Sequence, residues 1–155
     1  AVGEEEIGEY RAIILAQGIP NHISVDQYLM GTERKVEASC GGEDILIPGV
    51  MENSGRAGVH SGDSIAVYPR HNVNDDMLEV VLSASRHIAL AMKVQGLVNI
   101  QYLIYQNELY VIEVNHRTSR TITYLSKVTG VTMVELATRA MLGAKLGQLV
   151  YGTGI

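Results

Sequence analysis

The strongest constraint on the fold is a pair of β-type segments, residues 97–105 and 109–115, which only the polar residues 106–108 separate. So short a connection cannot cross over a sheet, so the two segments must pair as an antiparallel hairpin. Segments with helical apolar spacing lie before and after this hairpin. Helices combined with antiparallel strands indicate the α+β class, here an antiparallel sheet with helices packed on it.

Three helices are predicted from the apolar spacing. The first covers residues 4–18 and begins with an acidic turn. The second follows the N-cap Asn74, and the third starts at Thr132, with a capping box to Glu135, and ends at Gly143. The core face of the second helix is expected to consist of Met77, Val80, Val81, Ala84, Ile88, Ala91 and Met92.

Short β-type segments fill the region before the second helix. Strands are predicted at residues 23–29, 36–40, 45–47 and 64–68, and a turn at 41–44 makes 36–47 a hairpin. Residues 52–62 contain three glycines and few apolar side chains, which predicts a loop.

Charge and composition exclude several function classes. Twelve basic and seventeen acidic residues give a net charge of -5, which argues against nonspecific nucleic-acid binding. No apolar segment approaches the length of about 20 residues that a membrane span needs, and the N-terminal residues do not resemble a signal peptide. We therefore expect a soluble, cytoplasmic chain with neither a nucleic-acid nor a membrane partner.

The hairpin carries a candidate metal site. Side chains alternate between the faces of a strand, so Glu113 and Asn115 share one face. A three-residue turn at 106–108 would place Gln101 opposite Glu113 and Asn99 opposite Asn115. Gln101, Glu113 and Asn115 would then offer one carboxylate and two amide oxygens, which suit Mg²⁺. The alternative is that these residues form the solvated face of an ordinary half-buried hairpin.

Two further segments could bind phosphate. Arg117 and Arg120 follow the second hairpin strand directly, and guanidinium groups suit phosphate or carboxylate oxygens. The alternative is a solvated basic loop. The glycine-containing segment 58–64 could bring backbone amides close to a ligand, but it lacks the lysine and the spacing of a P-loop, and an ordinary tight loop is the alternative.

Four motifs together resemble one family. Residues 43–52, 56–64, 99–101 and 111–115 are similar to the large chain of carbamoyl-phosphate synthase, and the resemblance runs from about Val25 to Ile155. Segments 58–64 and 151–154 resemble more narrowly the C-terminal, synthetic half, whose ATP-grasp module phosphorylates carbamate. The resemblance implies that residues 23–155 form the C-terminal ATP-grasp subdomain and that residues 1–22 are a poorly matching helix and linker.

The resemblance also implies roles for individual residues. Gln101, Glu113 and Asn115 match ligands of Mg²⁺ or Mn²⁺ at the ATP phosphates, and Arg117 and Arg120 match arginines that stabilise the transferring phosphoryl group. Contacts to adenosine and to the nucleotide are implied for Gln27, Leu29, Glu33, Gly58, Val59, His60 and Ser61. Implied besides these are a K⁺ ion, a carbamate or bicarbonate substrate, partnership with the rest of the large chain and a glutaminase small subunit, and a place in pyrimidine and arginine biosynthesis.

The chain departs from the family pattern at several positions. His116 replaces a proline, Asn53 and Gly55 replace a histidine and a glutamate, and the pair Arg34-Lys35 is basic where the family alternates apolar and acidic residues. The first ATP-grasp subdomain, which carries the loop over the phosphates, should precede this segment. Three hypotheses follow: an incomplete piece of a carbamate-phosphorylating ligase, an inactive structural or oligomerisation domain, or another ATP-grasp carboxylate-amine ligase.

Overall fold

The computed structural model describes residues 3–18, 23–54, 65–69 and 74–149 of the 155-residue chain. The chain separates into two compact units, Ala1–Met30 and Gly31–Ile155. The boundary predicted after residue 22 stays a prediction. None of the helices within the described ranges combines the length and apolar character needed to span a bilayer.

Among its described residues, the first unit has one helix, α1 (Glu4–Ala16), which agrees with the helix predicted for residues 4–18. Gly18 follows it with a φ of 66°, the left-handed conformation that commonly ends a helix. No side chain of α1 is buried. The strand predicted at residues 23–29 is wrong, because these residues have no regular secondary structure and no partner strand to supply a ladder of hydrogen bonds.

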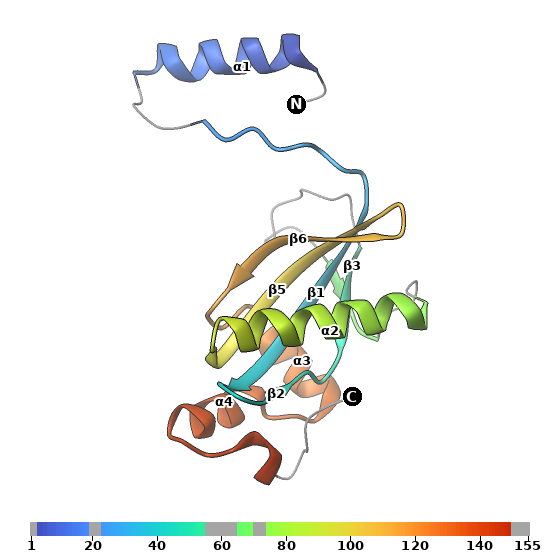
Figure 1. The fold of residues 1–155 in the computed structure, drawn as a ribbon, viewed down its shortest axis with the longest axis vertical. Helices are drawn as coiled ribbons and strands as arrows, with labels where there is room; N and C mark the ends of the chain where they lie inside the picture. Colours follow the sequence, from blue (N-terminus) through green and yellow to red (C-terminus); the bar gives the residue numbers. More distant parts are fainter. Residues whose placement is uncertain (1–2, 19–22, 55–64, 70–73, 150–155) are drawn as a thin grey trace. The chain divides into compact units, whose positions relative to one another are not determined.

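The second unit is built on an antiparallel sheet (Figure 1). Its strands are β1 (Thr32–Gly41), β2 (Ile45–Leu46), β3 (Val50–Ser54), β4 (Ile65–Val67), β5 (Gln95–Tyr105) and β6 (Glu108–Asn115). Their order is β4-β3-β1-β5-β6, and β2 pairs with the end of β1 in the predicted hairpin. Residues 52–54 belong to β3, so the predicted loop begins too early in the sequence.

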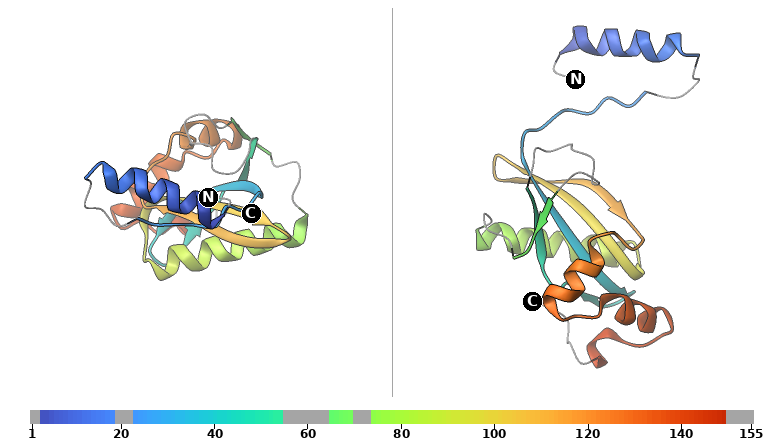
Figure 2. Two further views of the ribbon diagram at one scale, coloured as in Figure 1. Left: turned by 90° about the horizontal axis from the view of Figure 1, so that it is seen from above. Right: turned by 180° about the vertical axis from the view of Figure 1, so that it is seen from behind.

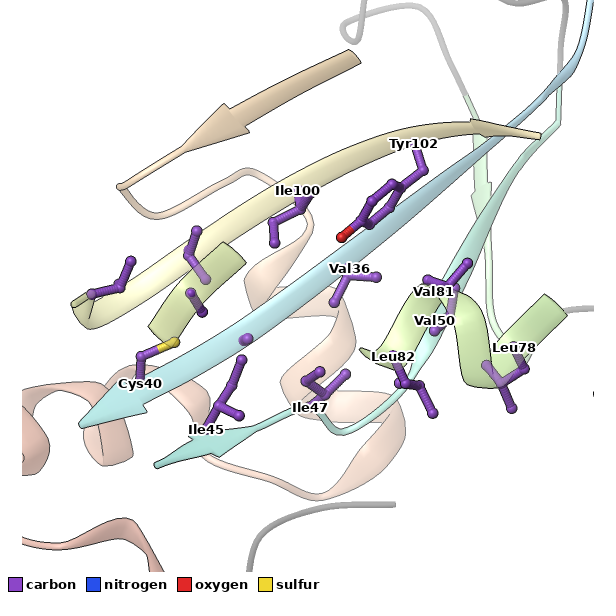
Figure 3. Close-up of a cluster of buried hydrophobic side chains, with 14 residues drawn as sticks. Val36, Cys40, Ile45, Ile47, Val50, Leu78, Val81, Leu82, Ile100 and Tyr102 are labelled. Atoms are coloured by element: carbon purple, nitrogen blue, oxygen red, sulfur yellow. The ribbon is translucent and has the colours of Figure 1, made fainter. Parts of the chain in front are cut away.

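Helix α2 (Asp75–Ala91) covers one face of this sheet, as the core drawn in Figure 3 shows. It begins as predicted, because Asn74 Oδ1 accepts a hydrogen bond from the Met77 N–H at 2.8 Å. Its core face is rotated from the predicted one, since Val80 and Met92 remain 49% and 52% exposed. The buried side chains of α2 are Met77, Leu78, Val81, Leu82, Ser85 and Ala89.

Helices α3 (Ile122–Thr129) and α4 (Met133–Met141) lie on the opposite face of the sheet (Figure 2). Ser39 Oγ of β1 donates a hydrogen bond to the Met133 carbonyl at 3.1 Å and so joins α4 to the sheet centre. Helix α3 was not predicted. The capping box predicted for α4 is wrong, because Thr132 makes no side-chain cap and Glu135 instead pairs with Arg139 at 2.6 Å. A short 3₁₀ helix, Leu146–Gln148, follows α4.

Candidate functional site

The site begins with the hairpin of β5 and β6, whose turn has two residues rather than the predicted three. Tyr105 pairs with Glu108, and Gln106 and Asn107 between them have φ values of 51° and 63°. Positive φ at both central residues is the property of a type I′ turn, which suits the twist of the strands it joins. An uninterrupted ladder from this turn would set Gln101 opposite Ile112.

A β-bulge restores the predicted pairing. Tyr102 pairs with Val111 whereas Gln101 pairs with Glu113, so Ile112 is the extra residue of β6. Asn99 then pairs with Asn115, as predicted. The bulge explains why Leu109 and Val114, an odd number of residues apart, both pack against the core beneath α2. The bulge also keeps the Glu113 side chain on the face of the sheet opposite α2.

Two rows of polar side chains run across β1, β5 and β6. The strand register aligns Lys35 with Gln101 and Glu113, which we name the Gln101 row. It aligns Glu37 with Asn99 and Asn115, which we name the Asn99 row. Both rows lie on the face that Ser39 shares, opposite α2, because odd-numbered residues of β1 point away from that helix.

The amide of Gln101 links the two rows. Its Nε2 donates to Glu113 Oε2 at 3.1 Å and to Asn99 Oδ1 at 3.4 Å. Both bonds use the amide nitrogen, so the carbonyl oxygen of Gln101 is not engaged by them. One carboxylate and the amide oxygens of Gln101 and Asn115 are thereby presented on one face of the sheet.

Glu37 anchors the segment that carries the two arginines. Its side chain is fully buried, and its Oε1 accepts hydrogen bonds from Asn99 Nδ2 at 2.9 Å, from Thr121 Oγ1 at 2.6 Å and from Ser119 Oγ. Burial raises the pKa of Glu37, and the hydrogen bonds from Ser119, Thr121 and Asn99 oppose that rise. Because two of these donors follow β6, Glu37 fixes residues 119–121 to the sheet centre.

The two rows and this anchored segment enclose a cavity of about 100 Å³. Both predicted arginines line it, next to the predicted metal ligands Gln101 and Asn115. The full lining is Lys35, Asn99, Gln101, Asn115, Arg117, Ser119, Arg120 and Thr121. Glu113 is not part of the lining and reaches it through its hydrogen bond with Gln101. Five of the predicted site residues are thus brought together.

The remaining predicted residues lie elsewhere. Glu33 is buried in β1, and its Oε2 accepts a hydrogen bond from Asn53 Nδ2 at 2.9 Å. Asn53 is one of the departures from the family pattern, and here it orients the Glu33 carboxylate. Gln27 is exposed and Leu29 half-buried in the first unit. Gly58, Val59, His60 and Ser61 lie outside the described residues.

The oxygen donors that β5 and β6 present beside the cavity suit a hard cation. Among the described residues no three His, Cys, Asp or Glu side chains converge on one point, which leaves one carboxylate with amide oxygens as the candidate ligands. Mg²⁺ is commonly bound in this way, with one or two carboxylates, and with water and phosphate oxygens completing its octahedron. A metal with a preference for sulfur or imidazole ligands would find no such set in this cavity.

Lys35, Glu37, Ser119 and Thr121 belong to the site but were not predicted. The signal for the first two was present, since Glu33, Lys35, Glu37 and Ser39 place polar side chains at alternate positions of one strand. Such alternation ordinarily indicates a solvated sheet face. Lys35 and Glu37 lie near the arginines only because β1 pairs with β5, and the sequence pattern does not specify this pairing.

Comparison with known proteins identifies similar sequences along the whole chain. Residues 16–149 match the family model described as carbamoyl-phosphate synthase L chain, ATP binding domain. The carbamoyl phosphate synthase large chains of Lachnoclostridium phytofermentans and Clostridium perfringens are 48% and 50% identical to this chain over 155 and 152 residues. These alignments cover 100% and 98% of this chain but only 14% of each relative.

A solved structure supports the architecture. The biotin carboxylase domain of a single-chain bacterial carboxylase superposes with a TM-score of 0.72, over 99% of this chain and 39% of that chain. The two sequences are 16% identical, so this match shows the shared fold alone.

Proposed function

The chain belongs to the family of the carbamoyl-phosphate synthase large-chain ATP-binding domain, and from this premise we propose that it forms the metal- and phosphate-binding wall of an ATP-grasp unit that phosphorylates carbamate. In this proposal ATP gives its terminal phosphoryl group to a carbamate oxygen, and the products are ADP and carbamoyl phosphate. The narrower assignment to the C-terminal, synthetic half rests on the motifs at 58–64 and 151–154.

One observation carries the proposal. The cavity collects oxygen ligands from β5 and β6 and guanidinium groups from the segment that follows β6. Phosphoryl transfer needs little covalent chemistry from a protein, because positioning and neutralisation of charge provide most of the catalysis. A wall that sets metal ligands beside two arginines supplies both.

Residues in and beside the cavity have distinct roles in this proposal. Gln101, Glu113 and Asn115 would hold Mg²⁺ or Mn²⁺, which when bound neutralises charge on the ATP phosphates. Arg117 and Arg120 donate N–H groups to oxygens of the transferring group, a geometry that planar guanidinium groups match well. Glu37 keeps the segment of Arg120 in place through Ser119 and Thr121.

The chain spans a small part of its curated relatives, so the rest of the reaction is assigned to other segments. We propose that another part of the large chain closes over the phosphates and that a glutaminase subunit supplies ammonia. A half-site without its cover admits water, and so the chain by itself should bind nucleotide without efficient transfer to carbamate.

Calorimetric titration with ADP and ATP tests the proposal on the 155-residue chain, with and without Mg²⁺. We expect binding that requires Mg²⁺ and becomes at least about tenfold weaker in Glu113→Gln, which loses the one carboxylate of the ligand set. Glu79→Gln is the matched control, because Glu79 is exposed on α2, on the other face of the sheet.

The same titration distinguishes the alternatives. Equal nucleotide affinity in Glu113→Gln and in the unsubstituted chain would remove Glu113 from the metal site. If no heat develops at millimolar nucleotide, the chain acts as a structural domain rather than as a binding wall.

A further inference from the structure

We propose that Lys35, a positively charged side chain within the Gln101 row, binds phosphate oxygens directly. The same side chain competes with a divalent metal ion for the ligands of that row. This inference rests on the proposed function and adds a binding residue that the sequence motifs do not assign. It concerns the ligand chemistry of the cavity, namely an oxyanion that binds there even when no metal is present.

The position of Lys35 is unusual for a lysine. It lies in β1, the strand between β3 and β5, and pairs with Met51 on one side and Gln101 on the other. Its side chain is only 5% exposed and lines the cavity. Burying an ammonium group is costly because its charge is desolvated, so a buried lysine that lines a polar cavity is an unusual feature.

The cavity itself has the character of an anion site. Lys35, Arg117 and Arg120 are its charged lining residues, and the other five carry amides and hydroxyls. Because the hydroxyls of Ser119 and Thr121 donate to Glu37, the three cations are the main ligands for an anion. No carboxylate belongs to the described residues that line it. A small tetrahedral oxyanion would therefore meet positive charge from the sheet and from the segment after β6.

Carboxylates surround Lys35 outside the cavity. Burial lowers the pKa of Lys35 most, Glu33 and Glu37 oppose that effect, Arg120 adds to it, and Glu113 opposes it. The ammonium group is thus coupled to Glu113, the carboxylate of the proposed metal site, and to Arg120, a proposed phosphate ligand. The charge of Lys35 therefore influences the binding of a metal ion as well as the binding of phosphate.

The coupling has opposite signs for the two ligands. A positive charge in the Gln101 row repels Mg²⁺ or Mn²⁺ and partly offsets the negative potential of the Glu113 carboxylate. It therefore lowers the affinity of the site for the free metal ion. The same charge attracts phosphate oxygens and raises affinity for an oxyanion. A lysine that acted only through packing would change both affinities in the same direction, or neither.

Two titrations of the 155-residue chain test this inference. Pyrophosphate is titrated in the presence of a chelator, and Mn²⁺ is titrated in the absence of any phosphate. In Lys35→Met we expect pyrophosphate to bind at least about tenfold more weakly and Mn²⁺ about threefold or more tightly. Lys145→Met, an equal charge change at an exposed lysine after α4, should leave both affinities within about twofold.

Several results would overturn the inference. The unsubstituted chain could fail to bind pyrophosphate in the absence of metal. A folded Lys35→Met chain could show unchanged affinities for pyrophosphate and Mn²⁺, or a shift of both affinities in the same direction. Should Lys35→Met not fold, the side-chain NMR signal of Lys35 in the unsubstituted chain provides the test. It must move on addition of pyrophosphate while that of Lys145 stays, and a stationary Lys35 signal refutes the inference.

The outcome is separable from that of the proposed function. Glu113→Gln tests the metal-dependent nucleotide site, whereas metal-free pyrophosphate binding depends on Lys35 and the arginines. If only one of the two expected effects is observed, the missing effect identifies which proposal has failed.

Discussion

Gln101 and Glu113 lie opposite each other in β5 and β6, with 3.1 Å between Gln101 Nε2 and Glu113 Oε2. Two features of the hairpin produce this pairing. The turn at Gln106 and Asn107 is one residue shorter than predicted, and the bulge at Ile112 adds one residue to β6. The pairing was predicted correctly although the turn was not, because the bulge offsets the shorter turn.

The anchor at Glu37 should be visible in the free energy of unfolding. Glu37→Leu removes the acceptor shared by Asn99, Ser119 and Thr121 and leaves these donors without it. We expect a loss of about 2–4 kcal/mol in urea unfolding, since an unsatisfied buried group costs about 1–3 kcal/mol. Glu79→Leu on the exposed face of α2 is the control, and an equal effect of both substitutions would contradict the anchoring role.

Two neighbouring valines test the orientation of α2. Val81 is 1% exposed in the core, whereas Val80 is 49% exposed. Val81→Ala should lower the free energy of unfolding by about 2 kcal/mol, through lost burial and a residual cavity. Val80→Ala should change it by less than about 0.5 kcal/mol. Equal losses in chemical denaturation would mean that α2 presents the face predicted from its sequence.

The N-cap of α2 makes a separate prediction. Asn74→Ala removes the acceptor of the Met77 N–H and should destabilise the chain by about 1 kcal/mol. Asn74→Asp retains an acceptor and adds a negative charge at the helix N-terminus, so it should be close to neutral in the same urea titration. A loss in the aspartate variant as large as that in the alanine variant would argue against capping.

Cys40 should be chemically inert in the folded chain. Its side chain is 2% exposed, and burial, with a further contribution from Asp44, raises the pKa of its thiol from 9.0 to about 12. Iodoacetamide at pH 8 should therefore modify Cys40 only after denaturation, which mass spectrometry can follow. Rapid modification without denaturant would contradict the buried position.

The same shift sets a pH dependence of stability. The folded-state pKa of Cys40 lies above the unfolded value, so its contribution is complete below about pH 9 and is lost as the pH rises toward about 12. The unfolding midpoint in urea should fall over this range, and less so in Cys40→Ala. An identical pH profile in that variant would assign the loss of stability to other groups.

The features of the fold that depend on residues close together in the sequence could be predicted from it. Asn74 starts α2 because its side chain caps the first turn, and the polar alternation of β5 and β6 predicted the pairing of Gln101 with Glu113. The segment of α3 was missed because Ile122, Thr123, Val128 and Thr129 are β-branched and have little helix preference of their own. Packing of Ile122 and Leu125 against the unit supplies what their intrinsic preference lacks.

The site could be predicted only in part for the same reason. Gln101, Asn115, Arg117 and Arg120 are close in sequence, and their neighbourhood follows from one hairpin. Lys35 and Glu37 come from a strand far away in sequence, and the register of β1 against β5 places them there. The rotation of α2 likewise depends on which of its apolar side chains the sheet accommodates, so Leu78 is buried and Val80 is not.

The bulge at Ile112 also bears on self-association. β6 is an edge strand of the sheet, and Tyr110, Val111 and Ile112 on it are 37%, 50% and 51% exposed. A long, regular edge with such side chains would be a template on which a second copy could add a strand. The extra residue breaks the spacing of the hydrogen-bonding groups and twists the strand away from a flat edge. Deleting Ile112 would therefore be expected to promote aggregation more than unfolding.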